Sequence, residues 1–336
     1  MRPGCAATTA SAPSTAPISA TRTATRSAPS EWARPEQPPV KVRIIVNRGG
    51  GSATPDVEER LKAAFEGLDV EPEVRLVEPH ELDRHCSDVA KEAGVDALVA
   101  AGGDGTISTA AAAVAGTDMA LGILPMGTLN HFARDAGIPT DLRQAAEVIA
   151  GGHTKQVDLA EVNGRIFVNN SAVGLYPRMV RRREAQQEHL GRGKRFAMLV
   201  ASLRTLRHFS SDRLTIRVEG RQEPIETPLL FVGNNRYAMS LMGLGKRDAI
   251  DRGELCLYAP LAKGRLRFFS VALRGIIGRT DRQADFVSLD GIASAEIHSR
   301  RPALLVATDG EAQTMETPLC YRIRAGALKL IVPEAA

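Results

Sequence analysis

Two glycines, an aspartate, a third glycine and a threonine follow one another at Gly102-Gly103-Asp104-Gly105-Thr106. They lie between the apolar run 97–101 and an alanine-rich segment that favours a helix. Glycines let main-chain N–H groups approach a polyphosphate closely, the helix N-terminus adds partial positive charge, and Thr106 adds a hydroxyl. The pattern predicts a loop that binds a phosphate through its backbone; an ordinary strand-to-helix turn is the alternative.

Asp104 needs a separate explanation, because a carboxylate beside phosphates is repelled by them. It is tolerated there if it holds Mg²⁺ or a water of the metal shell. We therefore predict a magnesium role for Asp104, and capping of the turn is the alternative.

A second loop, Pro125-Met126-Gly127-Thr128, follows the short apolar run 121–124. Both loops then lie at the carboxyl ends of neighbouring strands, where open α/β sheets bind ligands. The P-loop pattern G-x-x-x-x-G-K-[ST] is missing, and no intact G-x-G-x-x-G follows a strand. Walker-type ATPases and dehydrogenases are therefore disfavoured.

From Lys41 onward, short β-branched runs alternate with longer helical patterns, which is typical of a parallel sheet wrapped by helices. The pattern predicts strands at 42–46, 74–77, 97–101 and 121–124, and helices over 81–93 and 107–115. A further helix is predicted to begin at Thr54-Pro55, with Thr54 as its cap. Together these elements predict an α/β domain over residues 40–157.

Beyond this domain the apolar period changes to two. Alternating apolar residues at 214, 216 and 218, and again at 328, 330 and 332, indicate half-buried antiparallel strands. We expect a mainly β domain over residues 158–336, interrupted by helical regions near 177–207 and 265–277.

Residues 1–39 are rich in Ala, Ser, Thr and Pro and poor in acidic and large apolar residues, which predicts a disordered tail. An organelle transit peptide is the alternative. The four cysteines are scattered without a C-x-x-C pair, so we expect reduced thiols in a cytoplasmic protein. No apolar run approaches the roughly 20 residues that span a bilayer.

The formal net charge is +4. Basic residues gather in the predicted helix over 177–207, where they could rest on anionic lipid headgroups; a solvated helix face is the equal alternative. Aromatic residues make up only 4% of the chain, which disfavours nucleic-acid binding. The cluster comprises Arg178, Arg181, Arg182, Arg183, Arg192, Lys194, Arg195, Arg204 and Arg207.

Taken in order, several motifs resemble the diacylglycerol kinase catalytic-domain superfamily, which includes bacterial lipid kinases and sphingosine and ceramide kinases. Any one of them could arise by chance, but the ordered set covers nearly everything after Lys41. The motifs are Asn47 with its following glycines, 102–106, 124–133 (LPMGTLNHFA), 170–174 (NSAVG), 233–235 (GNN) and 308–311 (TDGE).

The resemblance implies a three-layer α/β nucleotide-binding domain, similar to that of NAD kinase and phosphofructokinase, followed by a β-sandwich with the active site between them. It further implies ATP and Mg²⁺ as ligands and Asp309 as the general base, assisted by Glu311. By the same resemblance, Mg-ATP contacts Asn47 and the 102–106 loop, and the nucleotide pocket is lined by Gly127, Thr128 and Asn130.

Asp309 also suits this role on chemical grounds. Phosphoryl transfer needs a carboxylate that accepts the proton of the attacking hydroxyl. Asp309 follows the apolar run 303–307 and precedes Gly310, so its carboxylate can project from the end of a rigid strand. A surface β-turn is the alternative.

One stretch departs from the family pattern. Relatives often carry an Asp-Gly pair that helps to bind a structural Mg²⁺, whereas here Arg252 occupies the acidic position before Gly253. Asp251 or Asp248 are the candidates to replace it as a metal ligand.

These observations lead us to expect an ATP-dependent lipid kinase, associated peripherally with anionic membranes, that converts diacylglycerol into phosphatidic acid. A homodimer is compatible with the sequence. The alternatives are a sphingoid or ceramide acceptor, a soluble-metabolite kinase similar to NAD kinase, and a non-catalytic nucleotide-binding protein that docks on membranes.

Overall fold

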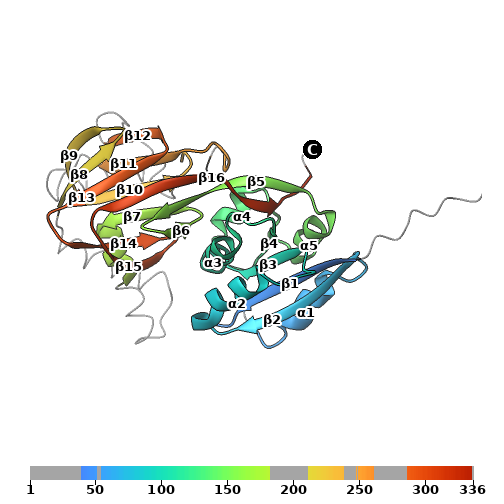
Figure 1. Cartoon of the computed structure of the whole chain (residues 1–336). Coiled ribbons are helices and arrows are strands. Elements are labelled where there is room, and N and C mark those ends of the chain that lie inside the picture. The colour runs from blue at the N-terminus through green and yellow to red at the C-terminus, as the bar shows by residue number, and fades with distance from the viewer. Residues whose placement is uncertain are drawn as a thin grey trace, which may run out of the picture. The chain divides into compact units, whose positions relative to one another are not determined.

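The computed structural model describes residues 39–50, 54–181, 211–237, 247, 249–260 and 286–334. Residues Pro39–Ala336 form one compact unit, drawn in Figure 1. Its described strands belong to two sheets, one of ten strands and one of six. The predicted tail, most of the helical region 177–207 and all of the region 265–277 lie outside the described residues.

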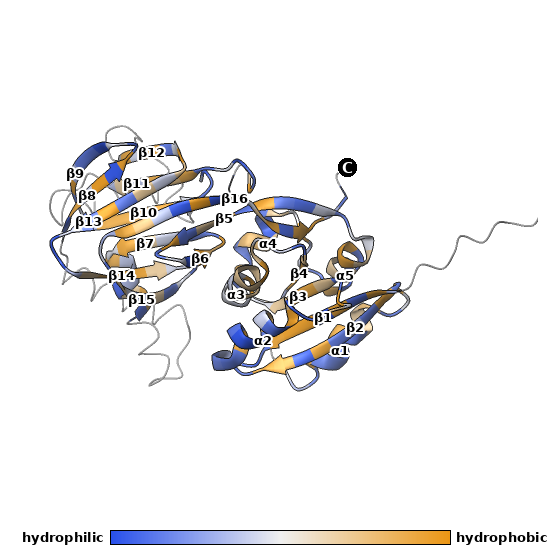
Figure 2. Cartoon of the chain, in the orientation of Figure 1, coloured by the Kyte–Doolittle hydropathy of each residue, from blue (hydrophilic) through white to orange (hydrophobic). Residues whose placement is uncertain are grey.

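Parallel strands build the first half of the ten-stranded sheet, in the order β2-β1-β3-β4. Every residue of β3 and β4 is buried, which explains their continuous apolar sequence, because parallel sheets are covered on both faces. Figure 2 shows this hydrophobic colouring along β1 and β3. All four predicted strands are present and extend beyond the predicted bounds: β1 (Val40–Asn47), β2 (Val70–Val77), β3 (Ala97–Gly102) and β4 (Ala120–Pro125).

Helices cover both faces of these strands. α2 packs on α3 and α1 packs on α5, and Figure 1 shows the two pairs on opposite faces. This arrangement confirms the predicted three-layer α/β domain. The helices are α1 (Val57–Ala64), the short 3₁₀-helix η1 (Pro79–Glu81), α2 (Leu82–Val89), α3 (Asp104–Val114), α4 (His131–Asp135) and α5 (Leu142–Gly151).

Three predicted helix ends differ from the structure by two residues or more. α3 begins at Asp104 rather than at 107, so Gly105 and Thr106 lie in its first turn. α1 begins at Val57 rather than at Pro55, and Thr54 does not cap it through its side chain. Instead the Thr54 carbonyl accepts the N–H of Val57 in a turn that precedes the helix. α2 ends at Val89, several residues before Gly94, because residues 90–92 continue as turns rather than as regular helix.

The long strand β16 (Leu319–Ile331) joins the parallel strands to the antiparallel part of the same sheet. Near its end it pairs in parallel with β4, where Leu330 faces Leu121, and along its length it pairs with β5. Its earlier residues pair with β13. The antiparallel part contains β5 (Thr154–Val162), β6 (Arg165–Phe167), β8 (Asp212–Val218), β9 (Arg221–Thr227) and β13 (Ser294–Ser299).

The second sheet packs against this antiparallel part, and apolar residues from both sheets form one shared core. Within it, the ring of Tyr321 meets Phe167 edge-on, and its hydroxyl lies 3.0 Å from Ser171 Oγ. This is the predicted β-sandwich. The second sheet has the order β12-β11-β10-β7-β14-β15: β7 (Asn170–Gly174), β10 (Leu229–Asn234), β11 (Leu255–Pro260), β12 (Phe286–Ile292), β14 (Ala303–Thr308) and β15 (Glu311–Glu316).

The α/β half and the sandwich each have their own hydrophobic core. β5 contributes Val157 and Leu159 to the first core and Ala160 and Val162 to the second. The predicted boundary at residue 157 therefore falls within a strand that serves both cores, and it stays a prediction. No helix of the described residues is long and apolar enough to cross a membrane.

Because the last apolar residues of β16 are buried in the α/β core, we expect them to contribute to the stability of the α/β half. We predict that Leu330→Ala lowers the free energy of unfolding by about 2–5 kcal/mol, the usual cost of such a truncation. Lys329→Ala, on the half-buried neighbouring position, is the matched control and should cost far less. Chemical denaturation measures both; equal losses would contradict the central role of β16.

Candidate active site

Asp309 occupies a tight turn, yet its side chain is directed inward. With Gly310 it forms the two-residue connection between β14 and β15, and both residues have positive φ, 48° and 88°. Asp-Gly is a favoured pair for such hairpin turns. The Asp309 carboxylate accepts the N–H groups of residues 168–170, at 2.8, 2.8 and 3.1 Å. A fourth donor comes from the other half of the unit, since Ser108 Oγ on α3 lies 2.7 Å from Asp309 Oδ2.

Two opposing effects act on the acidity of Asp309. Burial of its carboxyl raises its pKa above the ordinary value, because charge is disfavoured away from water. The hydrogen bonds from Ser108 and from residues 168–170 act in the opposite direction, because they favour the charged form. The residue as a whole is half-buried, but donors surround its carboxylate oxygens. A raised pKa makes a carboxylate a stronger proton acceptor.

Asp104 is the first residue of α3 and caps a different helix. Its two carboxylate oxygens accept the N–H groups of His131 and Phe132, each at 3.2 Å, at the start of α4. A third contact comes from Asn169 Nδ2, at 3.5 Å from Asp104 Oδ1. Asp104 therefore caps α4 rather than its own turn, and its magnesium role stays a prediction.

The two glycine loops touch one another. A Cβ added at Gly127 would lie 2.5 Å from Gly103 Cα and 2.6 Å from Asn130 Oδ1, so this contact requires glycine. Asn130, at a positive φ of 48°, closes the second loop by accepting the Gly127 N–H and donating to the Gly127 carbonyl. Asn130 is thus buried and engaged in holding the loop, whereas Thr128 at the loop tip is exposed.

The N-terminus of α3 has no side-chain cap, in contrast to that of α4. Gly103 and Gly105 leave little side-chain cover on its first turn. An uncapped helix start offers N–H donors and partial positive charge to an anion. Glu311 approaches this turn, because a Cβ added at Gly105 would lie 3.3 Å from its Oε1, while its Oε2 forms a 2.6 Å ion pair with Arg165.

The remaining predicted phosphate-loop residues gather at the same edge of the parallel sheet. Gly102 ends β3 and its carbonyl accepts the N–H of Met126 from the second loop. Thr106 is buried, with its Oγ1 only 2.6 Å from where a Cβ at Gly102 would lie. Asn47 ends the adjacent strand β1 and accepts the N–H of Gly49 in a local turn.

The structure separates Asp251 from this group. Its carboxylate forms a 2.7 Å ion pair with Lys155, and its role as a metal ligand stays a prediction. Asp248 lies outside the described residues. Among the described residues, no three His, Cys, Asp or Glu side chains gather in a way that could hold a metal ion.

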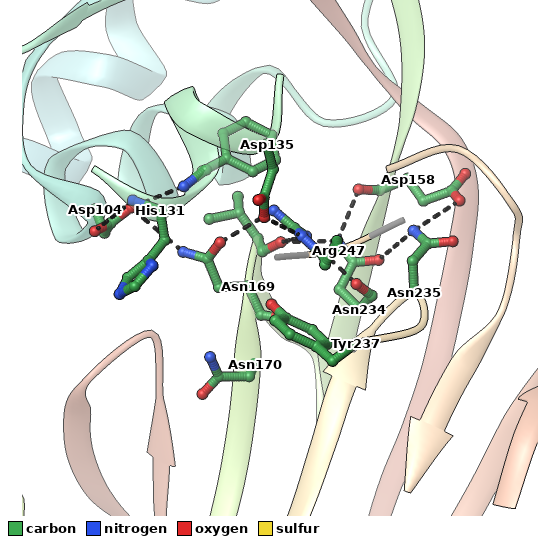
Figure 3. Close-up of polar contacts among 12 residues, drawn as sticks. Asp104, His131, Asp135, Asp158, Asn169, Asn170, Asn234, Asn235, Tyr237 and Arg247 are labelled. Carbon is green, nitrogen blue, oxygen red and sulfur yellow. Dashed lines mark hydrogen bonds and ion pairs between the residues drawn. The ribbon is translucent and has the colours of Figure 1, made fainter. Parts of the chain in front are cut away.

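Three residues of this group were not predicted from the sequence. Asn169 contacts Asp104 through its side chain and Asp309 through its backbone N–H, Ser108 donates to Asp309, and the buried guanidinium of Arg247 donates to Asn169 (Figure 3). The Asn169-Asn170 pair was a usable signal, since buried amides usually hold specific hydrogen bonds. Of the predicted basic cluster, only Arg178 and Arg181 are described.

A surface depression of about 600 Å³ lies elsewhere, over β8, β13 and β16. It shares no residue with the group around Asp104 and Asp309. Four of its charged side chains pair with one another, in the contacts Arg217–Glu296 and Arg322–Glu161. We assign it no role in the chemistry considered below.

Comparison with known proteins gives a consistent result. Residues 41–162 match the model of the diacylglycerol kinase catalytic domain. A Klebsiella pneumoniae protein described as a probable lipid kinase YegS-like is 31% identical over 217 residues, which cover 64% of this chain and 72% of that protein.

Solved structures share the fold. A diacylglycerol kinase from Bacillus anthracis superposes with a TM-score of 0.62 at 23% identity, over 87% of this chain and 96% of that chain. Yeast NADH kinase in complex with NADH superposes with a TM-score of 0.52 at 13% identity, over 88% of this chain and 83% of that chain. At these identities the likeness concerns the fold alone.

The contact between the two loops leads to a prediction about packing. Gly127→Ala should destabilise the protein by about 1–3 kcal/mol, because the new methyl group overlaps Gly103 and the Asn130 side chain. Gly151→Ala is the matched control: its added Cβ would meet only His153, at an ordinary 3.5 Å. Thermal unfolding should show a lower midpoint for Gly127→Ala alone; an unchanged midpoint would mean that the loops are not in contact.

Proposed function

Because this chain belongs to the family of the diacylglycerol kinase catalytic domain, we propose that it transfers the γ-phosphate of ATP to the hydroxyl group of a lipid. The observation that carries the proposal is the position of Asp309. This carboxylate comes from the sandwich, but Ser108 of α3 donates to it. A proton acceptor therefore lies against the same helix that begins at the phosphate-binding loop.

The two glycine loops supply the nucleotide side of the proposed reaction. ATP would place its phosphates at the uncapped start of α3, where backbone N–H groups and the helix dipole favour negative charge. Gly103 and Gly127 support this role, because their close approach sets the loops side by side. Asn130 holds the second loop in shape, and exposed Thr128 at its tip is free to contact the nucleotide in this proposal.

Mg²⁺ would be held together with ATP rather than by the protein alone. Magnesium is usually bound through one or two carboxylates plus substrate phosphates. Asp104 is the first residue of α3, and Glu311 approaches its first turn at Gly105. Both are already partly engaged, with the N–H groups of α4 and with Arg165. When bound, the metal would neutralise charge on the phosphates.

Asp309 would act as the general base. The lipid hydroxyl attacks the γ-phosphorus, its O–H proton passes to the Asp309 carboxylate, and the bond between the γ-phosphorus and the bridging oxygen of ADP breaks. Its three hydrogen bonds from backbone N–H groups fix the direction of the carboxylate, and the lipid hydroxyl would take the place of Ser108 Oγ as its fourth donor, so that the hydroxyl meets a positioned acceptor. Phosphoryl transfer depends mainly on such positioning.

Diacylglycerol is the acceptor that we propose, with phosphatidic acid as the product, and an anionic membrane surface as the place of reaction. A sphingoid base or ceramide would need the same hydroxyl chemistry. A soluble acceptor, as for NAD kinase, would use the same loops, and a non-catalytic membrane-docking protein would bind ATP without turnover. Transfer of label from γ-labelled ATP to a panel containing these lipids and NAD separates the four alternatives.

Loss of the base should separate catalysis from binding. We expect Asp309→Asn to lower turnover by about 10²–10⁴-fold while ATP still binds, because general-base catalysis contributes on that scale. Labelled-lipid formation measures turnover, and calorimetry measures ATP binding. Asp290→Asn is the matched control, since Asp290 accepts the Tyr258 hydroxyl within the sandwich. Full turnover in Asp309→Asn would remove Asp309 from the mechanism.

The pH dependence should report the state of Asp309. A base must be deprotonated, so kcat/KM falls as the pH drops through its pKa, which burial raises above the ordinary value. Ser108→Ala removes a hydrogen bond that lowers this pKa, so the acidic limb should move to higher pH. Thr117→Ala removes a hydroxyl bonded to Val114 at the far end of α3 and should leave the limb in place. A shift to lower pH in Ser108→Ala would contradict the assignment.

A further inference from the structure

Arg247 is a fully buried cation between the α/β half and the sandwich. Its side chain has no exposed surface, and its Nε lies 2.6 Å from Asp135 Oδ2 at the end of α4, whose side chain is 9% exposed. The guanidinium carbon also lies 5.4 Å from the centre of the Phe132 ring and 5.6 Å from that of Tyr237. A charge buried so deeply is costly unless its partners are well placed.

The three nitrogens of Arg247 serve different partners. While Nε faces Asp135, Nη1 donates to the Val168 carbonyl at 2.7 Å and to the Asn234 carbonyl at 3.3 Å. Nη2 donates to Asn169 Oδ1 at 3.1 Å. Burial acts against the charged form of Arg247, but Tyr237 and Asp135 raise its pKa above the ordinary value, so the group is a cation. The planar guanidinium of Arg247 thus links α4 to residues 168–170, whose backbone N–H groups bind the Asp309 carboxylate.

Arg247 also determines how the amide of Asn169 is turned. A guanidinium can only donate hydrogen bonds and a carboxylate can only accept them. Asn169 therefore has to present its oxygen to Arg247 and its nitrogen to Asp104, as Figure 3 shows. Asn169 is 4% exposed, its backbone N–H donates to Asp309, and its carbonyl accepts the Tyr237 hydroxyl.

From these contacts we propose that Arg247 is a positioning residue that acts through Asn169 and sets Asp104 and Asp309 relative to one another. Asp104 lies at the phosphate loop, Asp309 lies at the proposed acceptor hydroxyl, and Asn169 contacts both. The role in turnover rests on the proposed kinase function. The positioning itself does not, because it concerns contacts that are present without any ligand.

The shape of the guanidinium matters as much as its charge. Lysine carries one compact ammonium on a flexible stem, whereas arginine offers donors in a fixed plane. Arg247→Lys keeps a positive charge for Asp135 but cannot reach Asp135, Val168 and Asn169 together. It should therefore release the Asn169 side chain without leaving Asp135 unpaired.

The test compares Arg247→Lys with Arg43→Lys as a matched control. Arg43 is also shielded, with a side chain 16% exposed, and donates through Nε and Nη2 to Glu92, but it lies in the middle of β1. We expect kcat for lipid phosphorylation to fall about 10- to 100-fold in Arg247→Lys, as displacements near 1 Å at a reacting group do. The KM for ATP should change little, and Arg43→Lys should keep the wild-type kcat.

Asn169→Asp provides a second variant. It keeps Arg247 and an oxygen at position 169 that can accept the hydrogen bond of Arg247 Nη2. The new carboxylate can still accept from Arg247 but cannot donate to Asp104, so kcat should fall to a similar extent. The double variant should be little worse than the poorer single variant, because residues that act through one another are not additive. A wild-type kcat in Asn169→Asp, or additive losses in the double variant, would overturn the proposal.

Amide hydrogen exchange of the segment 165–173 tests the positioning without any turnover. Exchange should be faster in Arg247→Lys than in wild type and unchanged in Arg43→Lys, because residues 168–170 lose support for their bonds to Asp309. If wild type phosphorylates no lipid, the proposed function fails and exchange alone decides the role of Arg247. Unchanged exchange in Arg247→Lys would overturn that role.

Discussion

The carboxylate of Asp309 is the point at which the two halves of the molecule constrain one another. Three consecutive backbone N–H groups, at residues 168–170, converge on it from the connection between β6 and β7 and from the first residue of β7, and a hydroxyl from α3 is the fourth donor. An unpaired buried carboxylate would cost far more than these bonds return. The hairpin β14–β15, the start of β7 and the first turns of α3 therefore have to keep one mutual arrangement, and the chemistry depends on it.

The fold was largely readable from the sequence because its signals are local. Continuous apolar runs predicted β3 and β4, and the period of two predicted β8 and the end of β16. The phosphate loop was likewise visible, because glycines and a helix start are neighbours in the chain. The strands extend beyond their predicted bounds, α4 and α5 were not predicted, and helix ends differ, as at α1, where a proline and a threonine form a turn before the helix instead of its first residues.

The interior of the site could not be read in this way. Arg247 and Asp135 are 112 residues apart, and Asn169 and Asp309 are 140 apart, so no local pattern marks either pair. No sequence pattern singled out Arg247, and it is its burial against Phe132 and Tyr237 that distinguishes it. Asp251 is the opposite case. Its residue type drew attention as a possible metal ligand, but nothing in the sequence indicated that its carboxylate forms an ion pair with Lys155.

The late position of β16 in the chain affects how the α/β half folds during synthesis. Of the strands that the structure describes, β16 leaves the ribosome last, yet it covers the free edge of β4. Until then, the nascent α/β half exposes a fully apolar parallel strand with unpaired backbone groups, the kind of edge that invites association with other chains. Chaperone protection of the emerging polypeptide would be needed most during this interval.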